Sequence, residues 1–119
     1  MQEIKSFRDL FVWQKAHKCV LRIYQLTQSF PSDERFGLTS QIRRAAVSVA
    51  ANIAEGFKKK GIRDKLNYYN ISQGSLEEVR YFVILGHDLG YMKDDNIEKE
   101  LEEVAKMLES FRSKLESKL

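Results

Sequence analysis

The chain has 119 residues, a formal net charge of +3, one proline and six glycines. This length suits a single domain with its own hydrophobic core, and the scarcity of helix breakers favours helix over strand. The single cysteine, Cys19, excludes an intramolecular disulfide and a cysteine-based zinc site, which is typical of a reducing compartment. Because no segment has the apolar run of a secretory signal or a membrane span, we expect a cytoplasmic protein that does not act at membranes.

Apolar residues recur at helical spacing in four segments separated by turn-forming residues. They predict helices at about 7–29, 34–55, 62–89 and 95–117. Connections this short force neighbouring helices to run antiparallel. The expected fold is therefore all-α, a single antiparallel up-down-up-down four-helix bundle over residues 1–119.

The first two helices have recognisable starts. Ser6, with Asp9 three residues later, has the pattern of a capping box at the first helix. Pro31 should end that helix, and Ser32 or Asp33 can cap the second.

Glycine and aspartate mark the later boundaries. Gly56 is expected to be the left-handed residue that ends the second helix, and Gly90 is expected to do the same for the third. Asp94 or Asp95 can cap the fourth.

Two segments carry more apolar surface than a simple helix pair needs. In the first helix a second row of mostly apolar residues lies beside the row that faces the core. Its members are Trp13, His17, Val20 and Tyr24. The helix should therefore touch two neighbours or another subunit. In the second helix, residues 43–54 are alanine-rich around most of the circumference, which predicts burial on most sides and an inner pair formed with the third helix.

A polar stripe runs along the same alanine-rich helix. Its members follow spacings of three and four: Gln41, Arg44, Ser48, Asn52 and Glu55. The stripe is either a polar network or solvated edge of the bundle, or it lines a subunit interface or central channel. Glu55 opposes the helix dipole, so Arg43 or Arg44 of a neighbouring subunit is a candidate partner.

Basic residues cluster at the connection between the second and third helices. A short basic loop beside exposed helix ends can hold phosphates, although it can also be a solvated surface loop. Phe57, Tyr68 and Tyr69 could stack on bases nearby, but their spacing also fits the core. The candidate nucleic-acid-binding residues are Arg43, Lys58, Lys59, Lys60, Arg63 and Lys65.

Catalytic and metal-binding patterns are missing from the sequence. His17 and His87 have no carboxylate at metal-ligand spacing, and the E-x-x-H pattern of di-iron bundles is absent. Cys19 lies on the apolar face of the first helix that is expected to form the core, so we interpret it as a buried hydrophobic residue and not as a nucleophile. We expect no enzymatic activity, no cofactor and no metal.

Several segments resemble one bacterial protein family. They are Gln41–Gly56, Asp9–Gln14, Gly74–Glu78 and Leu89–Tyr91, in a match that extends over about residues 7–92. The chain resembles the four-helix-bundle proteins often encoded in intervening sequences of large-subunit ribosomal RNA genes. The family often has proline where this chain has Ala50, so the second helix should be straighter here.

The resemblance implies a four-helix bundle, a ring-like homo-oligomer, expected to be a pentamer, and no known catalysis. It also implies a likeness in fold to the accessory protein of diversity-generating retroelements, which is thought to bind nucleic acid and a reverse transcriptase. We therefore favour a homo-oligomer that binds RNA or DNA. The alternative is a protein-interaction scaffold with a protein partner and no nucleic acid.

Overall fold

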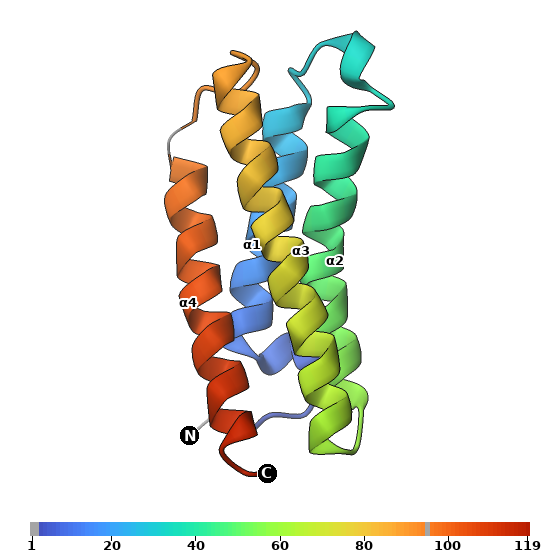
Figure 1. Cartoon of the computed structure of the whole chain (residues 1–119), viewed down its shortest axis with the longest axis vertical. Coiled ribbons are helices and arrows are strands. Elements are labelled where there is room, and N and C mark those ends of the chain that lie inside the picture. Colours follow the sequence, from blue (N-terminus) through green and yellow to red (C-terminus); the bar gives the residue numbers. More distant parts are fainter. Residues whose placement is uncertain (1–2, 95) are drawn as a thin grey trace.

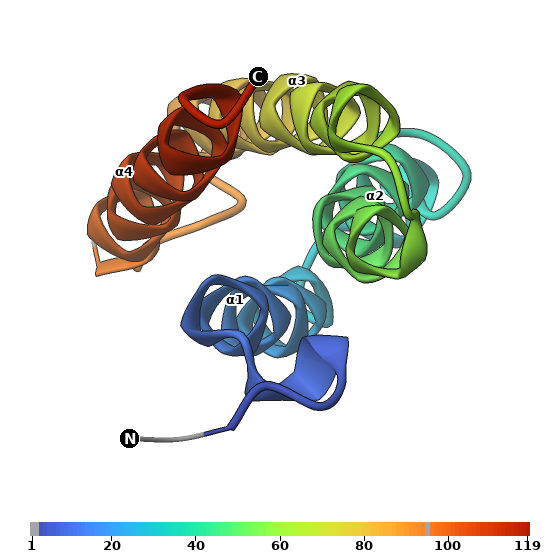
Figure 2. The ribbon, with the colours of Figure 1, turned by 90° about the horizontal axis from the view of Figure 1, so that it is seen from below.

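The computed structural model describes residues 3–94 and 96–119, which form four helices: α1 (Phe11–Thr27), α2 (Leu38–Lys58), α3 (Ile62–Asp88) and α4 (Asn96–Glu116). Successive helices run in opposite directions along the long axis (Figure 1). They follow one another in order around that axis (Figure 2). The predicted up-down-up-down four-helix bundle is confirmed. Among the described helices, none is long and apolar enough to cross a bilayer.

The core is formed by one apolar face from each helix, and α2 and α3 share the most extensive interface, as predicted. Small polar side chains let these two backbones come close. The Ser72 hydroxyl of α3, fully buried, donates a hydrogen bond of 2.7 Å to the Val49 carbonyl oxygen of α2. The main apolar residues of the core include Ile23, Ile42, Ile53, Val83, Ile97 and Leu108.

The first helix is shorter than predicted. Ser6 and Asp9 do form a capping box, but it closes a 3-10 turn, η1 (Phe7–Asp9). Leu10 is then extended, with ψ of 125°, and α1 starts only at Phe11. A buried Leu10 explains the break, because the extended backbone turns this side chain into the core.

The start of the second helix was also predicted wrongly. Ser32 and Asp33 lie in a second 3-10 turn, η2 (Ser32–Glu34), and α2 begins at Leu38. No side chain at the N-cap residue, Gly37, can accept a hydrogen bond. Instead, a Glu34 carboxylate oxygen accepts from the Leu38 N–H at 3.2 Å, which satisfies one free donor of the first turn.

Gly56 does not end α2, contrary to expectation. The helix continues to Lys58, and Gly56 is buried within it against α3. A Cβ atom at this position would lie 2.6 Å from Cε1 of Tyr69. Glycine is thus needed for close helix packing rather than for a left-handed turn.

The later boundaries agree with the sequence pattern. Gly90 follows α3 with φ of +78°, the left-handed conformation expected of it. A carboxylate oxygen of Asp94 accepts from the Asn96 N–H at 2.7 Å, at the start of α4. The other predicted cap, Asp95, lies outside the described residues.

Candidate functional site

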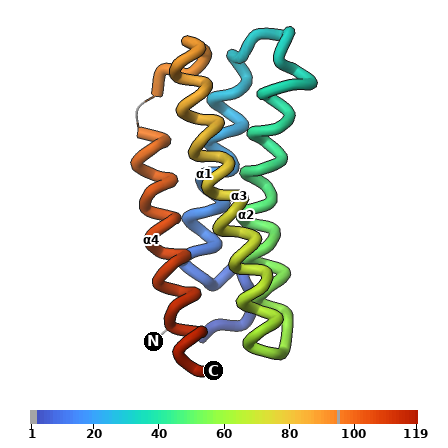
Figure 3. Tube along the Cα trace, in the orientation of Figure 1, coloured from blue at the N-terminus to red at the C-terminus, as the bar shows by residue number. Residues whose placement is uncertain are grey.

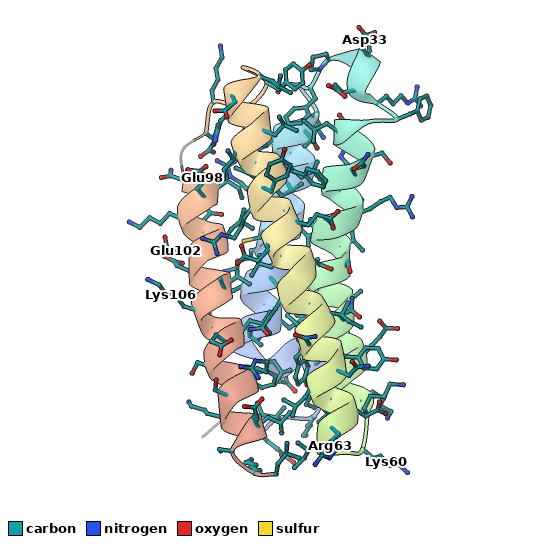
Figure 4. All side chains as sticks on the ribbon, viewed as in Figure 1. Asp33, Lys60, Arg63, Glu98, Glu102 and Lys106 are labelled. Carbon is teal, nitrogen blue, oxygen red and sulfur yellow. The ribbon has the colours of Figure 1, made fainter. Side chains whose placement is uncertain are left out.

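Residues 58–65, which we call the basic turn, end α2 and begin α3. The turn lies at one end of the bundle, where Lys60 and Arg63 point outward (Figure 4). The segment that precedes α1, from residue 3 on, and the end of α4 lie toward the same end of the bundle (Figure 3). The up-down-up-down order thus places the basic turn at the same end of the bundle as the start of α1 and the end of α4.

Two of the lysines predicted for this site have structural contacts. The Lys65 ammonium donates to the carbonyl oxygens of Phe57, at 2.6 Å, and Gly56, at 3.4 Å. It therefore caps the end of α2, and desolvation by burial lowers the pKa of Lys65. Lys59 lies 5.0 Å from the centre of the Tyr68 ring.

The other three predicted cations of the turn are free to meet a ligand. Lys58, Lys60 and Arg63 are exposed, and none forms an ion pair within the described residues. Beside them, the N-cap residue of α3 is Gly61, which has no side chain to cap the helix, so backbone N–H groups of the first turn lack a side-chain acceptor there. Free cations next to helix N–H donors are suited to phosphate oxygens.

Arg8 extends this surface and was missed in the sequence. It lies in η1, which packs against α2, and it is exposed with no ion pair in the described chain. The bundle topology could have indicated it, because the start of the first helix and the end of the second meet at one end. We define the basic end as Arg8, Lys58, Lys60 and Arg63.

Arg43 does not join the basic end. It lies fifteen residues before Lys58 on α2, which is about 22 Å along the helix. Its guanidinium donates to the Thr27 hydroxyl at 2.8 Å and to the Tyr24 carbonyl oxygen at 3.2 Å. It also lies 4.7 Å from the centre of the Tyr24 ring. Arg43 therefore joins α2 to α1.

The aromatic residues near the turn belong mainly to the bundle. Tyr69 is 1% exposed and its ring centre lies 5.0 Å from that of Phe111. Burial raises the pKa of Tyr69 to about 12. Phe57 is half-buried beneath Lys65, so phosphate contact rather than base stacking suits this end of the molecule.

The polar stripe of α2 lies along its edge with α3. The hydroxyls of Ser48 and Ser75 are 2.8 Å apart, and the Asn52 amide donates to the Ser48 hydroxyl at 3.0 Å and carbonyl oxygen at 2.8 Å. The middle of the stripe thus forms a short hydrogen-bond network between α2 and α3. Its remaining members, Gln41, Arg44 and Glu55, are exposed.

The alanine-rich segment, residues 43–54, is buried on most sides, as predicted, because only Arg44, Val47 and Ala51 are exposed, and these leave one side open. Val47 is 42% exposed and Ala51 is also exposed. On α1, Leu21 is 52% and Tyr24 is 40% exposed. Since Arg43 bridges Tyr24 to α2, these apolar side chains form one surface, which we call the α1–α2 face.

The residues considered for catalysis, Cys19 and His87, lie on different helices. Burial raises the pKa of the Cys19 thiol to about 11, which opposes a nucleophilic role. The His87 ring donates from Nε2 to the Asp94 carbonyl oxygen at 2.9 Å, and its Nδ1 lies 3.5 Å from a Glu98 carboxylate oxygen. Within the described residues, no group of three or more His, Cys, Asp or Glu side chains could hold a metal ion.

Comparisons with known proteins agree with this architecture. A family model described as 23S rRNA-intervening sequence protein matches residues 8–110. A crystal structure of a protein with unknown function from the S23 ribosomal protein family of Bacteroides thetaiotaomicron superposes with a TM-score of 0.78. The two chains are 25% identical, and the match covers 86% of this chain and 95% of the other. No curated protein matches the sequence.

Proposed function

The chain belongs to the 23S rRNA-intervening sequence protein family, and its structural relative is described as a protein with unknown function, so we propose a role from the surface of this chain. We propose that it is a non-enzymatic, homo-oligomeric protein that binds RNA or DNA through the basic end. The observation that carries this proposal is the group of exposed, unpaired cations at the basic turn. The uncapped start of α3 supports it, because helix N–H groups favour phosphate oxygens.

The contact is expected to be electrostatic and weakly selective for sequence. Each phosphate neutralised by a lysine or arginine releases counterions, so affinity should fall steeply as salt rises. One copy of the basic end offers only a few cations. An oligomer presents several copies, which raises the apparent affinity through multivalency without any new contact.

The test is the binding of a labelled RNA hairpin and a DNA duplex across a salt series. Replacing Lys58, Lys60 and Arg63 with alanine should weaken binding and reduce the salt slope by roughly two to three. A matched variant with Lys18, Lys93 and Lys99 replaced by alanine has the same net charge and should retain most of the affinity. Absence of binding at low salt, or equal losses in both variants, would refute the proposal.

A second candidate function, a protein-interaction scaffold, is favoured by the α1–α2 face. This face exposes three large apolar side chains, Leu21, Tyr24 and Val47, and an exposed apolar patch is typical of a protein-interaction surface. Arg44 and Glu55 flank this surface on α2 and have no ion pair in the described chain. Since Arg43 is occupied within its own chain, Arg44 is the better candidate partner for Glu55 of a neighbouring copy.

Mass measurement in solution tests this assembly. The resemblance puts the expected complex at five copies. Arg44→Glu and Glu55→Arg should each lower the mass at micromolar concentration, and the double variant should restore it because the opposite charges meet again. A wild-type monomer, or single variants with unchanged mass, would count against this interface.

A further inference from the structure

Within the described chain, Lys65 is the one cation of the basic turn whose side chain is bonded to backbone groups. Its ammonium donates to the carbonyl oxygens of Phe57, at 2.6 Å, and Gly56, at 3.4 Å, and it lies 5.3 Å from the centre of the Phe57 ring. These carbonyl groups belong to the last turn of α2, which lacks a full set of helical N–H partners. The half-buried side chain is therefore held in place at the end of α2.

The position of Lys65 in its own helix does not account for this arrangement. It is the fourth residue of α3, near the N-terminal end, where the helix dipole disfavours a cation. A carboxylate is favoured there instead, and Asp64 is the acidic residue of that turn. Lys65 therefore stabilises the end of α2 across the turn and not the start of α3.

Two helix ends of opposite polarity meet at the basic turn. The N–H end of α3 carries roughly half a positive charge, and the carbonyl end of α2 carries roughly half a negative charge. One lysine side chain joins the two ends, so at a nearby phosphate their effects offset each other. The ammonium of Lys65 brings a full positive charge to the negative end and outweighs it. Both sides of the turn are then positive.

Two carboxylates near the turn act against an anion. Asp64 lies in the first turn of α3 and Glu55 lies one turn before Lys58 on α2, and both are exposed. Neither forms an ion pair in the part of the chain that the structure describes. Without Lys65, the negative end of α2 would add to the repulsion from these two groups. The charge of Lys65 is therefore needed for an anion to bind, even though the ammonium is already bonded.

The bonds of Lys65 also fix the path of the turn. The Lys59 N–H donates to the Gly56 carbonyl oxygen at 3.2 Å, and the same oxygen accepts from the Lys65 ammonium. The Lys65 N–H donates to the Gly61 carbonyl oxygen at 3.0 Å, as α3 begins. Lys65 thus joins the end of α2 to the start of α3 through both its side chain and its backbone. The three free cations of the turn lie between these points of attachment.

We propose that Lys65 is a positioning residue for nucleic-acid binding at the basic end: it orders the turn and neutralises the negative end of α2, and it does not contact phosphate itself. This role rests on the nucleic-acid function proposed above. It leaves phosphate contact to Lys58, Lys60 and Arg63. Lysines that are close in sequence therefore have different tasks.

The salt dependence of RNA binding distinguishes a positioning lysine from a contacting one. Lys60→Met should lower the slope of log affinity against log salt by about one, because one phosphate is no longer neutralised. Lys65→Met removes the same charge, but it should lower the affinity for a labelled RNA hairpin by about fivefold at low salt and leave the slope nearly unchanged. Lys65→Arg should restore the affinity to within about twofold, because a guanidinium keeps the charge and can donate to both carbonyl oxygens.

Nuclear magnetic resonance relaxation tests the ordering of the turn without any nucleic acid. In the wild type, the backbone order parameters of residues 59–61 should be near 0.85, which is the value of about a rigid backbone. In Lys65→Met they should fall toward about 0.6, because the turn loses its attachment to α2. Lys60→Met and Lys65→Arg should keep the wild-type values. Circular dichroism shows whether each variant is folded.

Three results would overturn this role for Lys65. The first is wild-type RNA affinity in a folded Lys65→Met protein. The second is a fall in salt slope equal to that of Lys60→Met, which would show direct phosphate contact. The third is unchanged order parameters in Lys65→Met. A wild type that binds neither RNA nor DNA would refute the proposed function and the electrostatic part of this role, whereas a turn that loosens in Lys65→Met would still support the ordering part.

Discussion

Glu109 shows how neighbouring side chains tune a single surface carboxylate. It accepts hydrogen bonds from Arg112 at 2.8 Å, from Gln73 of α3 at 2.7 Å and from Ser113 at 3.1 Å. The Arg112 guanidinium is the main cause that lowers the pKa of Glu109 from 4.5 to about 2. The bond from Gln73 makes this cluster a link between α3 and α4.

This shift predicts a pH-dependent part of the stability. Because the folded state lowers the pKa, the stabilising effect of Glu109 is complete above about pH 4.5 and is lost as the pH falls toward about 2. Glu109→Gln should therefore unfold at lower urea than the wild type at pH 7, and the difference should shrink as the solution is acidified toward about pH 3. Arg112→Gln should show the same trend, and a difference that does not change with pH would contradict the prediction.

Sequence reasoning was least complete in assigning which residues cap the helices. The capping box at Ser6 and Asp9 was visible, but the pattern does not distinguish a 3-10 turn from an α-helix. Glu34 was not recognised as the cap of α2, because its hydrogen bond to Leu38 depends on the path of the chain around Gly37. The local sequence pattern identifies a helix end more securely than it identifies the side chain that accepts hydrogen bonds from the free N–H groups there.

At the scale of the helices, the closeness of α2 and α3 depends on small residues. Gly56 faces the Tyr69 ring, whereas Gly74 on α3 faces open space, with no atom within 4 Å of the point where a Cβ atom would lie. The same residue type therefore has opposite importance at the two sites. Sequence alone assigned Gly56 to a turn, since a glycine before a lysine run looks like a helix end.

Alanine substitutions at these two glycines should have opposite effects. Gly56→Ala should destabilise the fold by about 1–3 kcal/mol, because the new Cβ would crowd the buried Tyr69 ring. Gly74→Ala should stabilise it by up to about 1 kcal/mol, since alanine has the higher helix propensity and nothing obstructs it. Urea unfolding measures both, and a neutral or stabilising Gly56→Ala would refute the packing argument.

At the scale of the whole molecule, helix order determines which cations meet. The four helices could be predicted from apolar spacing and their antiparallel order from the short connections, and this order places Arg8 at the end of the bundle that carries the basic turn. The spacing could not show that Lys65 caps α2 or that Arg43 is bonded to α1, because both depend on contacts between helices. The candidate site in the structure is therefore smaller than the predicted set and has one new member.

The whole molecule has three separate surfaces. The basic end lies at the α2–α3 turn, the α1–α2 face runs along the side, and an apolar groove lies between α1 and α4. In a complex formed through the α1–α2 face, Glu55 would bring the interface to within one turn of Lys58 on α2, while Lys60 and Arg63 lie beyond the end of that helix. Assembly and nucleic-acid binding are thus compatible, and binding should strengthen with subunit number.

Contact between nucleic acid and the basic end can be measured as the reactivity of individual lysines toward an acetylating reagent, with and without a bound RNA hairpin, read by mass spectrometry. We expect Lys58 and Lys60 to become protected at saturating RNA, while Lys18, Lys93 and Lys99 react as before. Protection spread evenly over all exposed lysines, or confined to the second group, would show that the basic end is not where nucleic acid binds.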